Sequence, residues 1–303
     1  MIVSLKSIII DNGETMGYRE REGGMIPLLL VHGNMTSSKH WDVLMEVLDP
    51  KYKVYAIDLR GFGMSSYHKR ITSIKDFADD VKQFTDAMEL IDFAMIGWST
   101  GGAVAMQYCA DFPDTRAKLI LLASASTRGY PYFGHDLAEG SDGVVRYHSI
   151  EEIQQDALKT IPIQQAYDEQ KGELLRGIWN AVIYTQNQPS VNRYDAYLED
   201  MMTQRNLADV YHALNIFNIS DESNGLAQGS NQAKDLSIPV LILRGDRDLV
   251  ITEEMTNEII EDLGGNALFL PLENCGHSPL IDNLSLLIEK IESFIGKVHV
   301  GGG

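Results

Sequence analysis

Cysteine is scarce in this sequence, and its scarcity argues against a disulfide-stabilised fold. Only Cys109 and Cys275 occur among 303 residues, one within an apolar helical pattern and the other in a loop. Small secreted domains hold many cysteines at close spacing, because their disulfides replace a core that they are too small to build. We therefore expect both thiols to be reduced, and we assign neither a role.

Basic residues are few compared with acidic ones. The chain has 25 lysines and arginines against 43 aspartates and glutamates, which makes a formal net charge of -18, and it has no basic cluster suited to phosphate. Nucleic acid is therefore not an expected partner. The same charge disfavours an anionic membrane surface or a polyanionic substrate, so a small neutral substrate is favoured. The sequence leaves the oligomeric state open.

Long apolar segments and targeting signals are also missing. No apolar run approaches the roughly 20 residues that cross a bilayer. The segment 1–6 has neither a basic region followed by an apolar one nor a small-residue cleavage site. These absences predict a cytoplasmic protein without a membrane span. A hydrophobic content of 44% in 303 residues is enough for one large core, or for one core with an insertion.

Strand and helix patterns alternate along the first 126 residues. Two strand patterns, at 2–10 and 14–21, flank an Asn12-Gly13 step that favours a hairpin turn. The later strands are continuous apolar runs, which is typical of a parallel sheet covered on both faces. These runs lie at 26–31, 52–57, 93–98 and 117–122, and helical patterns begin near Trp41 and span 73–90 and 103–110.

The alternation stops after residue 126 and resumes after residue 234. Between them we find only helical patterns, at 149–161, 164–184 and 191–217, and then strand patterns return at 238–243 and 267–270. The sequence therefore predicts an α/β fold with a mostly parallel central sheet and helices on both faces. We assign residues 1–126 and 235–300 to this core, 127–234 to an inserted helical cap, and 301–303 to a flexible tail.

A serine between glycines is the feature most indicative of chemistry. The apolar run 93–98 predicts a buried strand that stops at Ser99, directly before a helical pattern. A chain that turns this sharply from strand to helix brings the positions of Gly97 and Gly101 together, so only very small residues fit. Ser99 would then hold a strained conformation with its hydroxyl exposed above the sheet. A Gly/Ser loop gives the same pattern, so the surrounding motifs must decide.

Four motifs follow one another in a fixed order along the chain, and together they resemble the α/β-hydrolase fold family, of the serine esterase and lipase type. The resemblance covers nearly the whole chain outside the cap. It implies an α/β-hydrolase fold whose ligand lies at the carboxyl ends of the strands. The motifs are His32-Gly33-Asn34, Asp58-x-Arg60-Gly61-x-Gly63-x-Ser65, Gly97-Trp98-Ser99-Thr100-Gly101, and the pair Gly245-Asp246-Arg247-Asp248 with Gly276-His277-Ser278-Pro279.

The resemblance implies a catalytic triad of Ser99, Asp248 and His277, in the family's order of nucleophile, acid and base. A serine hydroxyl is a weak nucleophile at neutral pH, so it needs a histidine base, and a carboxylate must fix the tautomer of that histidine. Spacing alone does not separate Asp246 from Asp248, but the family's Gly-x-x-Asp pattern selects Asp248. The family's other position for the acid follows the sixth strand, where this chain has Ser124-Ala125-Ser126 and no carboxylate.

The resemblance also implies an oxyanion hole made by the backbone N–H groups of Asn34 and Thr100. Preorganised donors of this kind stabilise the charge of the transition state by about 3 kcal/mol each. Met35 is the alternative to Asn34. A histidine in the position of His32 more often braces the oxyanion loop than transfers protons, so we leave it out of the site.

The residue at position 99 separates two kinds of chemistry within the family. The loop 32–38 is similar to that of haloalkane dehalogenases, which, like epoxide hydrolases, use an aspartate nucleophile. Ser99 cannot form their alkyl-carboxylate intermediate, so acyl transfer is favoured. No metal-ligand cluster or dinucleotide fingerprint occurs, and no cofactor is implied. Cap aromatics such as Tyr130 and Trp179 are more often cap core than pocket, and we leave them out.

The resulting prediction is a carboxylic-ester hydrolase that works through an acyl-serine intermediate. The box Gly97–Gly101 is also similar to that of certain bacterial intracellular polyhydroxybutyrate depolymerases, which makes a polyester substrate one alternative. Acyl transfer to an acceptor other than water needs the same residues. A ligand-sensing receptor that keeps the fold and the triad is an alternative of another class, and turnover would distinguish it.

Overall fold

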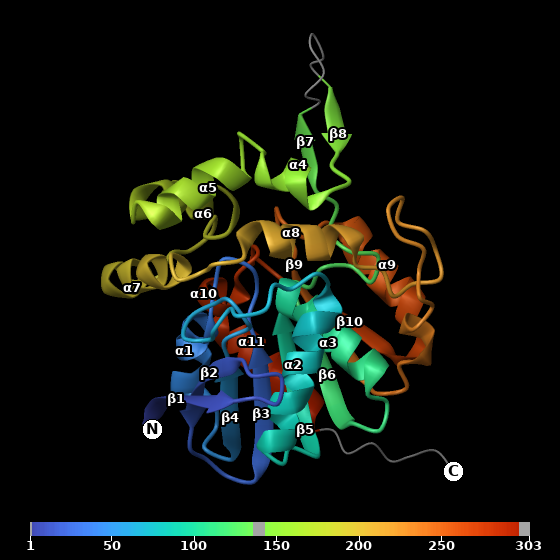
Figure 1. Cartoon of the computed structure of the whole chain (residues 1–303). Coiled ribbons are helices and arrows are strands. Elements are labelled where there is room, and N and C mark those ends of the chain that lie inside the picture. Colours follow the sequence, from blue (N-terminus) through green and yellow to red (C-terminus); the bar gives the residue numbers. More distant parts are fainter. Residues whose placement is uncertain (1, 136–142, 297–303) are drawn as a thin grey trace.

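An eight-stranded sheet forms the centre of the computed structural model, which describes residues 2–135 and 143–296 (Figure 1). The strand order is β1-β2-β4-β3-β5-β6-β9-β10. The β1–β2 and β2–β4 pairs are antiparallel, and all other neighbours in this sheet are parallel. The strands are β1 (Val3–Ile9), β2 (Thr15–Arg21), β3 (Ile26–Val31), β4 (Tyr52–Ile57), β5 (Asp92–Trp98), β6 (Arg116–Leu122), β9 (Val240–Gly245) and β10 (Ala267–Leu272).

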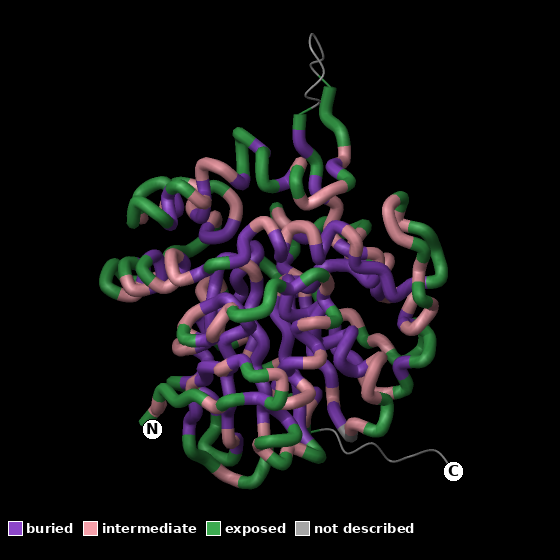
Figure 2. The backbone as a smooth tube through the Cα atoms, in the orientation of Figure 1, coloured by how far each residue is buried: buried purple, intermediate pink, exposed green. Residues whose placement is uncertain are grey.

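Helices cover both faces of this sheet, and this explains why its central strands are apolar along their length. In β3, for example, residues 28–31 are all fully buried, as expected for a parallel strand covered on both sides. Figure 2 shows the buried residues gathered around the sheet. One face packs against α2 (Ile74–Ala87), α3 (Thr100–Asp111) and α9 (Glu253–Leu263), and the other against α1 (Asp42–Val47), α10 (Pro279–Asp282) and α11 (Leu284–Gly296).

A mainly helical insertion separates β6 from β9. The predicted class, a mostly parallel α/β sheet with a helical insertion, is thereby confirmed. The bounds 127–234 remain a prediction, and the predicted tail 301–303 lies outside the described residues. The insertion comprises β7 (Phe133–His135), β8 (Val144–Arg146), α4 (Ile150–Gln154), α5 (Thr160–Asp168), α6 (Gly172–Val182), α7 (Val191–Met201) and α8 (Leu207–Ile216).

Four details of the insertion differ from the sequence prediction. The pattern 164–184 is divided between α5, which ends at Asp168, and α6, which begins at Gly172. Strands β7 and β8 pair in a small separate sheet, where only helices were expected. The pattern 149–161 is not one helix, because Asp156 Oδ1 accepts the N–H groups of residues 158 and 159 in a turn before α5. The pattern 191–217 is also interrupted, because α7 ends at Met201 and α8 begins at Leu207.

Both cysteines are free and buried, in agreement with the expectation of reduced thiols. Burial raises the pKa of Cys109 to about 12 and that of Cys275 to about 11, so both remain thiols at neutral pH. No helix within residues 2–135 and 143–296 has the length and apolar character needed to cross a membrane.

Candidate active site

Ser99 stands at the sharp turn between β5 and α3. Its backbone angles are φ 56° and ψ -118°, a conformation that non-glycine residues rarely adopt and that costs on the order of 1–3 kcal/mol. Hydrogen bonds on both sides hold the turn: the Ser99 N–H donates to Leu122 O at 3.0 Å, and its carbonyl accepts from Gly102 N at 2.9 Å. The side chain is only half-buried. The strained turn thus presents one hydroxyl at the carboxyl end of the sheet.

The glycines around Ser99 are required by contact between backbones. A Cβ at Gly97 would lie 2.3 Å from Gly101 O, and a Cβ at Gly101 would lie 2.2 Å from Val31 O. Both distances are far below van der Waals contact, and backbone atoms cannot rotate away. The predicted reason for the Gly-x-Ser-x-Gly pattern is therefore confirmed.

We expect Gly101→Ala to destabilise the protein by about 1–3 kcal/mol or more, because its methyl group would overlap the β3 backbone. Gly177→Ala is the matched control. Gly177 lies within α6, and a Cβ there meets nothing within 4 Å. This control should stabilise by about 0.5–1 kcal/mol through helix propensity. Thermal unfolding of both variants tests the pair, and an unchanged melting temperature for Gly101→Ala would contradict the steric argument.

His277 and Asp248 lie together, as the predicted base and acid should. His277 Nδ1 is 3.0 Å from Asp248 Oδ2 and 3.2 Å from Oδ1, and both side chains are almost fully buried. Because a carboxylate accepts, Nδ1 carries the proton and Nε2 is left as an acceptor. Among the described residues, no hydrogen bond joins the His277 ring to Ser99 Oγ. The structure thus pairs the predicted acid with the predicted base and, within the part of the chain that it describes, shows no hydrogen bond between the predicted base and Ser99.

Asp248 is held as an ionised carboxylate. Burial favours its neutral form, but the adjacent His277 and the N–H groups of Ile251 and Val250 outweigh burial and bring the Asp248 pKa below its ordinary value. Those N–H groups donate to Oδ1 at 2.9 and 2.8 Å. Asp246 is different: it is exposed, and its Oδ1 accepts from Cys275 N at 3.1 Å. This contact supports the loop.

A residue that the sequence did not single out ties the histidine loop to the nucleophile strand. The indole Nε1 of Trp98 donates to the backbone carbonyl of His277 at 2.9 Å, and the two rings lie 5.9 Å apart. Trp98 directly precedes Ser99, so the bond fixes the backbone of His277 relative to Ser99. The one sequence signal for this contact was the tryptophan within Gly97–Gly101, because a buried indole N–H needs an acceptor.

The loop that follows β3, residues 32–38, lies against Ser99; we call it the oxyanion loop. A Cβ at Gly33 would stand 3.0 Å from Ser99 Cβ and 3.6 Å from its Oγ. The backbone N–H groups of Asn34, Met35 and Thr100 form no hydrogen bond within the described residues. All three are therefore free to donate to an anion, and Thr100 also begins α3, where the helix dipole favours negative charge. Asn34 and Met35 are thus both candidates for the donor from the oxyanion loop.

His32 braces this loop from inside the core. Its Nε2 accepts the Leu59 N–H at 2.9 Å, and its Nδ1 lies 2.7 Å from the carbonyl of Gly33. Complete burial lowers the pKa of His32 to about 4, so the ring is neutral at pH 7, with Nδ1 as donor. These contacts agree with a bracing role.

We expect this histidine to make the fold acid-sensitive. The unfolded chain binds the proton near the ordinary histidine pKa of about 6.5, whereas folded His32 does so near 4. The unfolded state therefore holds more protons between these values. The free energy of unfolding decreases as the pH is lowered across that window, by up to about 1.4 kcal/mol per pH unit. Urea unfolding at several pH values, compared with His32→Gln, measures this slope. Parallel slopes in the two proteins would contradict it.

The Asp58 motif shapes the next loop and supports the oxyanion loop. Asp58 Oδ1 accepts from Ser38 N at 2.8 Å, and Oδ2 accepts from Met64 N at 2.9 Å. Gly63 has φ 49°, and a Cβ there would lie 2.4 Å from the Asp58 carboxylate. One buried carboxylate thus fixes the loops after β3 and β4 relative to each other.

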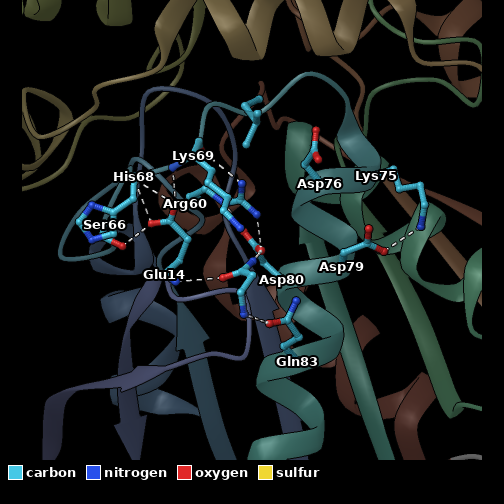
Figure 3. Close-up of polar contacts among 12 residues, drawn as sticks. Glu14, Arg60, Ser66, His68, Lys69, Lys75, Asp76, Asp79, Asp80 and Gln83 are labelled. Carbon is cyan, nitrogen blue, oxygen red and sulfur yellow. Dashed lines mark hydrogen bonds and ion pairs between the residues drawn. The ribbon is translucent and has the colours of Figure 1, made fainter.

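Figure 3 shows how the loop after β4 is anchored to the rest of the core. Arg60 Nε donates to Asp80 Oδ2 of α2 at 2.7 Å, and Asn12 Nδ2 donates to Asp80 Oδ1 at 2.7 Å. Glu14 accepts the backbone N–H groups of His68 and Lys69 at 2.9 and 2.6 Å. The turn between β1 and β2 therefore holds this loop in place.

Residues 26–284 match the family model described as the alpha/beta hydrolase fold. A pimeloyl-[acyl-carrier protein] methyl ester esterase from Pectobacterium carotovorum is 24% identical over 282 residues, covering 91% of this chain and 97% of that protein. Among solved structures, an esterase from Exiguobacterium antarcticum aligns with a TM-score of 0.73 at 16% identity, over 96% of this chain and 99% of that one. The epoxide hydrolase CorEH aligns with a TM-score of 0.72 at 21% identity, over 97% and 99%. These structural likenesses establish the fold, and the residues of the site must indicate the chemistry.

Proposed function

The chain belongs to the α/β-hydrolase fold family, and from this premise we propose that it is a carboxylic-ester hydrolase acting through an acyl-serine intermediate on Ser99. The observation that supports this most directly is the buried His277–Asp248 pair, whose loop is tied to the nucleophile strand through Trp98. The methyl ester esterase named above matches over nearly its whole length and agrees with this reaction class.

In the proposed reaction, Ser99 Oγ attacks the ester carbonyl carbon while His277 Nε2 takes the hydroxyl proton. The negative charge that develops on the carbonyl oxygen is received by the N–H groups of Thr100 and of Asn34. Collapse of the tetrahedral intermediate releases the alcohol, which takes the proton from His277. A water molecule, deprotonated by the same nitrogen, then attacks the acyl-serine, and His277 returns this proton to Ser99 Oγ as the acid leaves. Asp248 holds the histidine tautomer throughout and stabilises the imidazolium.

For the substrate we propose a small uncharged ester, with methyl and other short alkyl esters as the first class to test. A net charge of -18 disfavours anionic substrates at a distance. Methyl esters are suggested by the name of the relative, and at 24% identity we do not extend its acyl-carrier-protein substrate to this chain. The similar proteins reported above do not support a polyhydroxybutyrate substrate. That alternative depends on the similarity of the segment Gly97–Gly101 alone.

A panel of esters tests this proposal. It comprises methyl esters of increasing acyl length, p-nitrophenyl esters from acetyl to palmitoyl, and amorphous polyhydroxybutyrate, each assayed with the wild type. We expect multiple turnovers on the small esters and little release from the polymer. Release of a single equivalent without further turnover would indicate a ligand-sensing protein, and products that form only with an added alcohol or amine would indicate an acyltransferase.

A further inference from the structure

The connection between α7 and α8, residues 202–206, joins the insertion to both loops of the site. The Gly63 N–H donates to Thr203 Oγ1 at 2.9 Å, and the Arg205 N–H donates to Gly61 O at 2.9 Å. Gln204 Nε2 donates to Asn34 Oδ1 in the oxyanion loop at 2.8 Å. A short stretch of the insertion is thus fastened to the loop after β4 and reaches a candidate oxyanion donor.

Gln204 is buried and fully hydrogen-bonded, with 3% of its surface exposed. Its Nε2 also donates to Asn206 Oδ1 at 3.0 Å, and its Oε1 accepts from Tyr167 OH at 3.2 Å. The hydrogen bond between Asn206 and the backbone of Arg60 determines how the Gln204 and Asn206 side-chain amides are oriented. Asn206 Nδ2 donates to the carbonyl of Arg60 at 2.7 Å, so Asn206 Oδ1 must accept, and Gln204 must present its NH₂ group to Asn34.

We propose that Gln204 is a positioning residue for the oxyanion hole, because it holds the Asn34 side chain and thereby the direction of the neighbouring N–H groups. This inference rests on the proposed esterase function. Asn34 is only half-buried, and Met35 beside it has φ 58°, a conformation that needs outside support to persist. N–H donors that point toward an oxyanion stabilise it less when they are displaced by a fraction of an ångström.

The far end of the oxyanion loop has its own anchor on the insertion. Ser37 Oγ donates to Asp200 Oδ1, near the end of α7, at 2.6 Å. This contact lies three residues beyond Asn34, so it holds the loop without orienting the Asn34 side chain. Only Gln204 contacts that side chain by a hydrogen bond within the described residues. Removing Gln204 should therefore loosen the hole while leaving the loop folded.

A positioning role predicts a particular kinetic pattern for Gln204→Ala. The oxyanion is common to all ester substrates, so kcat should fall by a similar factor, about tenfold, for every acyl length, with KM nearly unchanged. A residue that merely lined the acyl pocket would change KM and the preference for chain length. Gln204→Met preserves most of the side-chain volume without the hydrogen bonds, and we expect the same loss from it.

The decisive experiment is a double-mutant cycle of Gln204→Ala and Asn34→Ala, which retains the backbone N–H at position 34. If Gln204 acts through the Asn34 side chain, the double variant should be no slower than the slower single variant. The matched control is Gln164→Ala in α5, whose half-buried side chain donates a hydrogen bond to Asp168 on its own helix. It should match the wild type. Circular dichroism and melting temperatures confirm that each variant is folded.

The outcomes separate the two proposals. If wild-type turnover depends on Ser99 but the losses in the cycle multiply, or if KM alone changes, Gln204 is not a positioning residue and the esterase assignment stands. If no ester is turned over in a Ser99-dependent manner, the proposed function itself is rejected, and the oxyanion role of this network with it. Unchanged kcat in a folded Gln204→Met variant would also overturn the inference.

Discussion

Ser99→Ala should lower kcat by on the order of 10^4 or more while the protein remains folded. The substitution removes only the hydroxyl oxygen that would form the acyl intermediate. The backbone hydrogen bonds of the turn, from Ser99 N to Leu122 O and from Gly102 N to Ser99 O, do not involve the side chain. Turnover of the best ester in the panel is the measurement, with circular dichroism as the check on folding.

Ser124→Ala is the matched control for that experiment. Ser124 follows β6 at the same edge of the sheet, and its hydroxyl donates to the carbonyl of Ala125 at 2.8 Å. We expect near-normal turnover from it. A fluorophosphonate should label the wild type and Ser124→Ala at Ser99, and should not label Ser99→Ala. Turnover by Ser99→Ala within tenfold of the wild type, or a label on another residue, would remove Ser99 from its proposed role.

The core and the order of the motifs were predictable because local patterns determine them. Continuous apolar runs occur where a strand is covered on both faces, and β3 and β4 have the predicted bounds. The glycines near Ser99 reflect backbone contacts within a few ångströms, which a short motif records. The choice of Asp248 over Asp246 required the family pattern, and the structure brings Asp248 to His277.

The contacts between the insertion and the site were not predictable. The sequence 191–217 has one helical pattern, because residues 202–206 are compatible with a helix by propensity. Long-range hydrogen bonds to Gly61, Gly63 and Asn34 compete with the helix there and interrupt it. A partner about 140 residues away leaves no periodic signal. Trp98 and Gln204 were missed for the same reason, since their partners lie far along the chain.

Asp248→Asn should lower kcat by up to about 10^4, the loss that follows when the triad aspartate of a serine protease is replaced by asparagine. An asparagine oxygen still accepts the N–H groups of Val250 and Ile251, so the loop should keep its shape. Its NH₂ group would then face His277 Nδ1 and make that nitrogen an acceptor. The proton would move to Nε2, which could no longer take a proton from Ser99. The measurement is kcat across a pH series, because the wrong tautomer lowers the maximum of the profile.

Asp246→Asn provides the control, because the two carboxylates share one loop and differ in their partners. Asp246 is exposed and accepts the Cys275 N–H, a bond that an asparagine oxygen can also accept. Its replacement removes one solvated charge and should change kcat by less than about tenfold. If Asp246→Asn is the severely impaired variant and Asp248→Asn is near normal, the role of the acid passes to Asp246. In that case the buried His277–Asp248 contact is structural, and the base depends on a different carboxylate during the reaction.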